Sequence, residues 1–260
     1  MPLPRYPGKF QSSPFFNPSD FLGYIRGLGA LPPGPPPKGV ILSYQSSLSR
    51  YVMDTCATRP AGAYFDDKLC YIDEAWAGSG RLALASGFGI GAPAAAVMLE
   101  ELIAWGVEEF VSLGTAGSLR ADLPPGSLAL CTGAFRDEGT SWHYMQGDEP
   151  AAPDPGLTSR LESALMENGL AFSKGPSWTI DAIYRETPRE ILGYRDEGAL
   201  VVEMEASALF AVAAFRKKPI AACFSVSDTL AELSWRPEFH ASSTKEGLQK
   251  LFHAAVRALL

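Results

Sequence analysis

Residues 81–114 limit the possible fold more than any other part of the chain. An apolar segment, RLALAS, leads through the glycine-rich turn GFGIGAP into the helical pattern AAAVMLEELIAWG (94–106) and then into a second apolar segment, EEFVSLG. Pro93 suits the first turn of a helix and Gly106 suits its end. Two strands joined by one helix predict a parallel, right-handed βαβ unit, so we expect an α/β fold.

The rest of the chain divides into a proline-rich arm and one domain. Residues 1–38 are rich in proline, and they predict an extended arm with one short helix at 18–29, capped by Ser19 or Asp20. Residues 39–260 have the size of a single domain. In this domain we expect further strands and helices: strands at 39–44, 68–76, 126–135, 198–204 and 219–228, and helices at 156–169, 205–218 and 243–260.

The composition excludes several classes of function. The net charge of −7 and the pI of about 5.1, without basic clusters, argue against nucleic-acid binding. The N-terminus lacks the apolar core of a signal peptide, and no apolar run approaches the roughly 20 residues of a membrane span, so we expect a cytoplasmic protein. The four cysteines form no CxxC pair and the three histidines have no zinc-type spacing, so we expect no metal.

Two carboxylates interrupt the apolar segment VVEMEASALF (201–210). Glu203 and Glu205 lie where a predicted strand passes into a predicted helix. Ligands of α/β sheets bind at the carboxyl ends of strands, and a carboxylate there can accept hydrogen bonds from the two adjacent hydroxyls of a ribose. The alternative is purely structural: Glu205 caps its helix and Glu203 pairs with an arginine.

Two other predicted strand ends carry similar chemistry. The segment SLGTAGSL (112–119) ends a strand with small residues and the hydroxyl of Thr115, and such turns offer backbone N–H groups to an anion. The segment FSVSD ends a strand at Asp228, whose carboxyl group is a candidate general acid. An ordinary turn and an ordinary helix cap are the structural alternatives.

Motifs for two other functions are incomplete. Gly87, Gly89 and Ala92 satisfy the G-x-G-x-x-A pattern of dinucleotide-binding proteins after a strand. That pattern also requires an acidic residue about 20 positions further on, where this chain has Ser112, Leu113 and Gly114. A Ser-His-Asp hydrolase is disfavoured too, because the chain has no G-x-S-x-G motif and few histidines.

Taken together, the stretches GFGIGAP…LEELIAWGVEEFVSLGTAGSL, FRDEGTSWHY, VVEMEASALF and FSVSD resemble the nucleoside phosphorylase and nucleosidase superfamily. They follow the family's order across residues 81–228. The resemblance implies one α/β domain whose central twisted mixed β-sheet is partly closed into a barrel and flanked by helices. It also implies cleavage of the N-glycosidic bond of a nucleoside, by phosphate in the phosphorylases and by water in the nucleosidases.

The resemblance assigns roles to particular residues. Glu205 matches the glutamate that binds the ribose hydroxyls, and Met204 matches the methionine that packs on the ribose. Glu203 matches the preceding glutamate, near the base. Asp228 matches the aspartate that protonates the leaving base in the purine-cleaving members.

The resemblance does not decide which base the nucleoside carries. Asp228 favours a purine, whereas FRDEGTSWHY is more similar to the uridine enzymes. The aromatic residue that stacks on the base falls at Ile183, with Tyr184 next to it, so both are candidate base-binding residues.

The phosphate pocket shows the largest departure from the family. The resemblance implies Gly89, Gly114, Thr115 and Arg136 for this pocket. The phosphorylases also carry a glycine and an arginine in the loop after the first strand, where this chain has Tyr44 and Leu48. A second arginine, three residues before Thr115, is replaced by Ser112. A phosphate dianion prefers cationic, bidentate partners, so this loss favours hydrolysis as an alternative.

Replacement charge has several possible sources. These are Arg50, Arg136, Arg185 or a residue of a neighbouring subunit, and the structural alternative for Arg136 and Arg185 is an ion pair. Three functions therefore stay open: a phosphorylase (a pentosyltransferase), a nucleosidase, and a member that binds a nucleoside without cleaving it. We expect no cofactor apart from phosphate as co-substrate. The resemblance implies a homodimer, or a hexamer built as a trimer of dimers.

Overall fold

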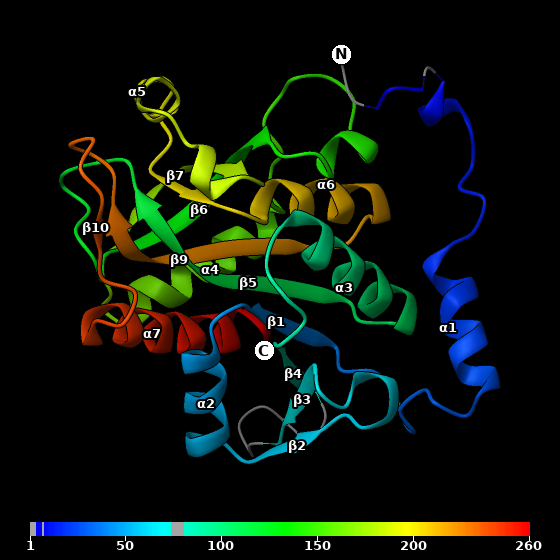
Figure 1. Cartoon of the computed structure of the whole chain (residues 1–260). Helices are drawn as coiled ribbons and strands as arrows, with labels where there is room; N and C mark the ends of the chain where they lie inside the picture. Colours follow the sequence, from blue (N-terminus) through cyan, green and yellow to red (C-terminus); the bar gives the residue numbers. More distant parts are fainter. Residues whose placement is uncertain (1–3, 7, 74–80) are drawn as a thin grey trace.

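The computed structural model describes residues 4–6, 8–73 and 81–260, and in these residues one mixed sheet forms the centre of the molecule (Figure 1). Its strand order is β10-β9-β6-β7-β8-β5-β1-β4-β3-β2. The strands are β1 (Gly39–Ser43), β2 (Thr58–Pro60), β3 (Leu69–Ile72), β4 (Leu82–Ala85), β5 (Glu109–Ser118), β6 (Leu128–Asp137), β7 (Ser173–Ile180), β8 (Val201–Glu203), β9 (Ile220–Thr229) and β10 (Arg236–Pro237).

The sheet closes on itself through β5. This strand pairs with β8 on one side and with β9 on the other, so β5, β9, β6, β7 and β8 form a closed five-stranded barrel. The pairs β5–β9, β6–β7 and β7–β8 are parallel, whereas β5–β8 and β6–β9 are antiparallel. The expected mixed sheet, partly closed into a barrel and flanked by helices, is therefore confirmed.

Helices cover the sheet in two groups with separate apolar cores. The helices are α1 (Pro18–Gly27), α2 (Ser46–Thr55), α3 (Ala92–Trp105), α4 (Pro155–Glu167), α5 (Pro188–Asp196), α6 (Ala206–Arg216) and α7 (Ser242–Leu259). Helices α3 and α6 pack together on one side, and α4 packs on α7 on the other (Figure 1). Strand β1 serves both cores, because Val40 and Leu42 face the first and Ile41 faces the second, as the alternation of a strand requires.

The predicted βαβ unit is present as β4, α3 and β5. Its two strands are parallel, with β1 inserted between them and paired to both. In the arm, the predicted helix is α1, but its cap is Asn17 and not Ser19 or Asp20. Asp20 takes the third helical position, where its carboxylate accepts a hydrogen bond from the Asn17 N–H at 2.7 Å, because a capping box needs its acid there. The last part of the predicted strand 68–76 lies outside the described residues.

Five of the helices and strands were not predicted: the short strands β2 and β10, helix α2, strand β7 and helix α5. Helix α2 follows β1 directly, in a stretch that the resemblance treats as a loop. Strand β7 contains Gly175 and Pro176, which usually argue against a strand. Helix α5 begins at a capping box in which the Thr187 hydroxyl accepts from the N–H of Glu190, while the Glu190 carboxylate accepts from the Thr187 N–H.

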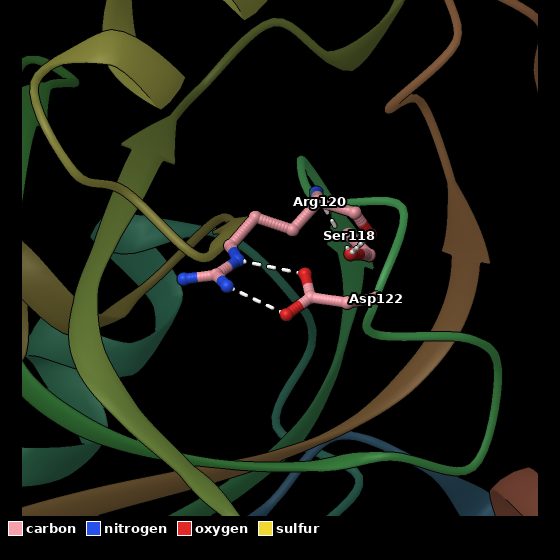
Figure 2. A network of polar contacts seen from close by, with 3 residues as sticks. All are labelled: Ser118, Arg120 and Asp122. Atoms are coloured by element: carbon pink, nitrogen blue, oxygen red, sulfur yellow. Dashed lines mark hydrogen bonds and ion pairs between the residues drawn. The ribbon is translucent and has the colours of Figure 1, made fainter.

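A compact turn ends β5 (Figure 2). The buried Ser118 hydroxyl donates to the carbonyl oxygen of Arg120 and accepts from its N–H. The Arg120 guanidinium bends back and forms two hydrogen bonds, of 2.8 and 2.6 Å, with the carboxylate of Asp122. The turn directs the chain away from β5 just after the residues that reach the cavity described below. In the described part of the chain, no helix combines the length and apolarity that crossing a bilayer requires.

Candidate functional site

One cavity of about 780 Å³ lies at the carboxyl ends of β5, β8 and β9 and beside the segment that follows β1. This is the edge at which an α/β sheet binds its ligands. Seven of the predicted site residues line this cavity together: Thr115, Ile183, Tyr184, Glu203, Met204, Glu205 and Asp228. The structure thus brings the ends of several strands to one hollow.

A β-bulge in β9 shapes one wall of the cavity. Ala116 of β5 pairs with Val226, and the next residue, Gly117, pairs with Asp228, so Ser227 is an extra residue in β9. Successive side chains of a regular strand point to opposite faces, but Ser227 and Asp228 both line the cavity. The bulge therefore places two consecutive polar side chains on the same side.

Glu205 lies at the junction between β8 and α6. It is the N-cap residue of α6, but its carboxylate does not cap the helix; it accepts a hydrogen bond of 2.6 Å from the backbone N–H of Gly91. Gly91 has φ of 92°, a conformation that suits glycine. Burial, and then the nearby Glu203 carboxylate, raise the pKa of Glu205 to about 8. The two oxygens of a carboxyl group offer several acceptor positions, so these backbone contacts leave capacity for ligand hydroxyls.

Glu203 caps α6 in place of Glu205. Its Oε2 accepts hydrogen bonds of 2.7 Å from the backbone N–H groups of Glu205 and Ala206. Its Oε1 accepts from the hydroxyls of Ser177 and Thr179 on β7. The purely structural alternative is therefore wrong in both parts: Glu205 does not cap its helix, and Glu203 is held by hydroxyls and backbone N–H groups where an arginine was expected. Burial raises the pKa of Glu203.

Asp228 is buried and held at both oxygens. The Ser227 hydroxyl donates to Oδ1 at 2.7 Å, and the indole N–H of Trp235 donates to Oδ2 at 3.0 Å. Trp235 lies in the segment between β9 and β10 and is itself 63% exposed. The short β10 pairs with the end of β9, which returns this segment over the cavity.

Glu186 is a cavity residue that sequence reasoning missed. It follows the short 3-10 helix Ile183–Arg185, before α5 begins. The pKa of Glu186 is raised to about 7, mainly by burial and then by the charges of Asp228 and Glu190. The sequence offered only a weak signal, since Glu186 stands in a polar segment, YRETPRE, without strand or helix periodicity.

The opposite end of the cavity lies beside the segment after β1. Tyr44 and Gln45 line it with Thr115, and the Gln45 amide donates to the Thr115 hydroxyl at 2.9 Å. The Tyr44 hydroxyl lies 3.2 Å from that of Ser112. These are two of the positions at which the resemblance expects phosphate-binding residues. Burial, with a smaller contribution from Glu205, raises the pKa of Tyr44, so its hydroxyl stays neutral.

Three residues expected in the phosphate pocket do not line the cavity: Gly89, Gly114 and Arg136. Gly89 stands next to the lining residue Ile90, and Gly114 lies beneath the Tyr44 ring, where a Cβ atom would come within 3.5 Å of it. Arg136 is buried and donates to the Ser141 hydroxyl and to the carbonyl oxygens of Met145 and Gly147. Its guanidinium therefore organises a loop away from the cavity, so the structure does not support a direct phosphate contact for it.

Positive charge on the cavity lining is sparse. Arg50 and Arg185, the other expected sources of charge, do not line it. Within the described residues, Lys245 is the only lysine or arginine on the lining, and His240 is the only histidine. Ile183 and Tyr184 lie at the edge, 41% and 94% exposed. Across residues 4–6, 8–73 and 81–260, no group of three or more His, Cys, Asp or Glu side chains is arranged to hold a metal ion.

Solved structures share this fold. A purine nucleoside phosphorylase from Toxoplasma gondii, in complex with immucillin-H, superposes with a TM-score of 0.74 at 19% identity, covering 86% of this chain and 90% of that one. A uridine phosphorylase from Vibrio fischeri gives a TM-score of 0.68 at 22% identity, covering 86% and 91%. A mixed sheet closed into a barrel, with a cavity at its strand ends, is thus the nucleoside phosphorylase fold.

The sequence places the chain within a family. The family model described as Phosphorylase superfamily matches residues 71–260, so the chain belongs to this superfamily and the resemblance is confirmed. A guanosine phosphorylase from Halorubrum lacusprofundi is 40% identical over 125 residues, which cover 48% of this chain and 52% of the relative. A uridine phosphorylase from Treponema pallidum is 31% identical over 140 residues, covering 50% and 54%. The chain spans about half the length of these curated relatives.

Proposed function

We propose that the chain is a nucleoside phosphorylase, which cleaves the N-glycosidic bond of a purine nucleoside and transfers the pentosyl group to phosphate. The observation that carries the proposal is the single cavity shared by Thr115, Met204, Glu205 and Asp228. Its volume suits a small-molecule ligand. Relatives named guanosine phosphorylase and purine nucleoside phosphorylase support a purine, while those named uridine phosphorylase make uridine a necessary substrate to test.

The geometry supports a division of labour along the cavity. Glu205 accepts hydrogen bonds from the ribose hydroxyls, and Met204 packs on the sugar between the two ends. The nucleophile sits at the end that carries Thr115, and the base sits at the end that carries Asp228. Such fixed positions hold the nucleophile in line with the bond that breaks. Hydrogen bonds from the ribose hydroxyls to Glu205 that are stronger in the oxocarbenium-like transition state than in the substrate lower the barrier.

Hydrolysis is a second candidate, and one specific observation favours it. Tyr44 and Ser112 occupy positions at which phosphorylases carry phosphate-binding residues, and they contact each other at 3.2 Å. Lys245 is the single lysine or arginine on the described cavity lining. A phosphate dianion needs more cationic partners than water does. Phosphate use by this chain therefore requires charge from Lys245 or from a second subunit.

One assay separates these functions. The protein is incubated with guanosine, inosine, adenosine or uridine, with and without phosphate, and the free base, ribose and ribose-1-phosphate are quantified. Phosphate-dependent release of ribose-1-phosphate supports the phosphorylase, whereas release of ribose at equal rates in both buffers supports the nucleosidase. Glu205→Gln is the matched control, which should lose activity with either nucleophile. Calorimetric binding without turnover on any nucleoside would leave only a binding function.

We also propose that the chain works as a homodimer or as a trimer of dimers. Ile90 and Tyr184 at the cavity edge are 63% and 94% exposed. A second copy seated over this edge would remove both side chains from water and add groups to the pocket. Sedimentation velocity measures the assembly, and a strictly monomeric, fully active protein would contradict the proposal.

A further inference from the structure

The base end of the cavity holds two carboxyl groups that differ in their hydrogen bonding to the protein. Both oxygens of Asp228 accept hydrogen bonds from the protein. Glu186 lines the same cavity, and within the described residues its carboxyl group has no hydrogen-bond or ion-pair partner. This difference bears on which of the two delivers a proton to the leaving base.

Asp228 serves the protein as a hydrogen-bond acceptor at both oxygens. An indole N–H can only donate, so the Trp235 contact at 3.0 Å requires Oδ2 of Asp228 to act as an acceptor. The Ser227 hydroxyl donates to the other oxygen at 2.7 Å. Both oxygens of Asp228 are thus occupied by donors from the protein, which leaves Glu186 as the carboxyl group on this part of the described lining without such a partner.

We propose that Glu186 carries the proton that the leaving base takes up, and that Asp228 acts as its anionic partner. This inference rests on the proposed function, because it assigns a further catalytic residue to the same reaction. The chain directs Glu186 to the cavity between the 3-10 helix Ile183–Arg185 and the start of α5. The Glu186 carboxyl group has no partner within the described residues, so the O–H of its protonated form is free to donate to a ligand.

Burial and the surrounding negative charges favour the protonated form of Glu186. Asp228 approaches from β9 and Glu190 from α5, and both raise its pKa, after burial, to about 7. Glu190 itself is committed to the backbone N–H and hydroxyl of Thr187. Of the basic side chains on the described lining, His240 and Lys245 come from the C-terminal part of the chain. Near neutral pH, Glu186 thus exists in both protonation states, as a general acid requires.

The proposed step balances without a further reactant. The bond between the sugar C1′ and the purine N9 breaks, and its electron pair passes to the base. The proton of the Glu186 carboxyl group moves to N7 of the base, and an oxygen of phosphate or water bonds to C1′. The nucleophile releases one proton in this process. Glu186 regains a proton from solvent, so the catalyst returns to its starting state.

The test compares a nucleoside that needs protonation with one that does not. In 7-methylguanosine, N7 is already alkylated, so its base leaves without taking a proton. With guanosine or inosine, Glu186→Gln should lower kcat roughly 100-fold or more, in the range of general acid catalysis. With 7-methylguanosine the same variant should lose less than about fivefold. Glu197→Gln, on the exposed end of α5, is the control and should behave as the unmodified protein.

The pH profile provides the second measurement. The rate with guanosine should fall above about pH 7 in the unmodified protein, and this limb should shift to lower pH in Asp228→Asn, because the anion that raises the pKa of Glu186 is gone. Equal losses on guanosine and 7-methylguanosine in Glu186→Gln would overturn the inference and leave the proposed function intact. If the unmodified protein releases base from neither nucleoside, the proposed function fails, and the inference fails with it.

Discussion

The hydroxyl of Tyr44 lies 3.2 Å from the hydroxyl of Ser112. Ser112 lies in β5, and Tyr44 directly follows the adjacent parallel strand β1, whose register sets Leu42 opposite Ser112. The contact fills space in which the resemblance expects phosphate-binding residues. Beside Thr115, an aromatic ring and hydroxyl groups thus stand where the resemblance expects an arginine.

Restoring an arginine at this end should strengthen anion binding. In the double variant Tyr44→Gly/Ser112→Arg, loss of the ring makes room for the guanidinium. A charged hydrogen bond contributes about 1.5–3 kcal/mol, so phosphate should bind at least about tenfold more tightly than to the unmodified protein. Calorimetric titration with phosphate measures this, with Tyr44→Gly alone as the control and a thermal melt to verify folding. Unchanged affinity would show that this end of the cavity does not receive the anion.

Glu205 should make stability depend on pH in a defined direction. Its pKa in the folded protein, about 8, is raised above that of the unfolded chain, so the folded state retains a proton that the unfolded state has lost. The contribution is fully present below the unfolded pKa, near 4.3, and is lost as pH rises through about 8. Glu205→Gln removes this dependence. The melting temperature of the unmodified protein, relative to that of Glu205→Gln, should therefore fall between pH 5 and pH 8, and a constant difference would contradict the assignment.

Gly91→Ala should weaken both the fold and the ribose site. Gly91 has φ of 92° and no atom within 4 Å of an added Cβ, so the cost comes from backbone strain, about 1–3 kcal/mol. The strain displaces the N–H that holds Glu205. Chemical denaturation and the KM for the nucleoside report the two effects. Gly193→Ala, in α5 and equally unobstructed, is the control and should be neutral or slightly stabilising.

Arg136→Lys should lower stability without changing the KM for phosphate. A lysine cannot reproduce three hydrogen bonds to Ser141, Met145 and Gly147, so we expect a loss of about 2 kcal/mol or more. The KM for phosphate should stay within about twofold, because Arg136 does not line the cavity. A large rise in that KM with an unchanged melting temperature would return Arg136 to the nucleophile pocket.

Local periodicity accounts for the parts of the fold that were predicted from sequence. The βαβ unit of β4, α3 and β5 lies in one uninterrupted stretch, so its pattern was legible without tertiary information. The insertion of β1 between the two strands was not, because strand order depends on contacts distant in sequence. Strand β7 was missed because Gly175 and Pro176 conceal it, and α2 because its apolar positions are few.

The features of the site also divide into those that local sequence predicts and those that depend on tertiary contacts. Thr115, Glu205 and Asp228 were expected at strand ends, where chain direction alone brings side chains to one edge. The contacts that define their chemistry join distant segments: Gly91 with Glu205, and Gln45 with Thr115. Glu186 belongs to a connecting segment, and only the packed structure reveals that it faces Asp228.

The bulge at Ser227 links the number of residues in β9 to the side chains that reach the cavity. Because side chains alternate along a strand, a regular β9 would present only one of Ser227 and Asp228 to the cavity, whereas the bulge presents both and keeps the Ser227 hydroxyl on Oδ1 of Asp228. A scan that substitutes residues one at a time, without changing the number of residues in β9, would not reveal this role of the bulge. The extra residue in the backbone, as much as the identity of residue 228, decides whether this carboxyl group enters the cavity with a hydroxyl partner beside it.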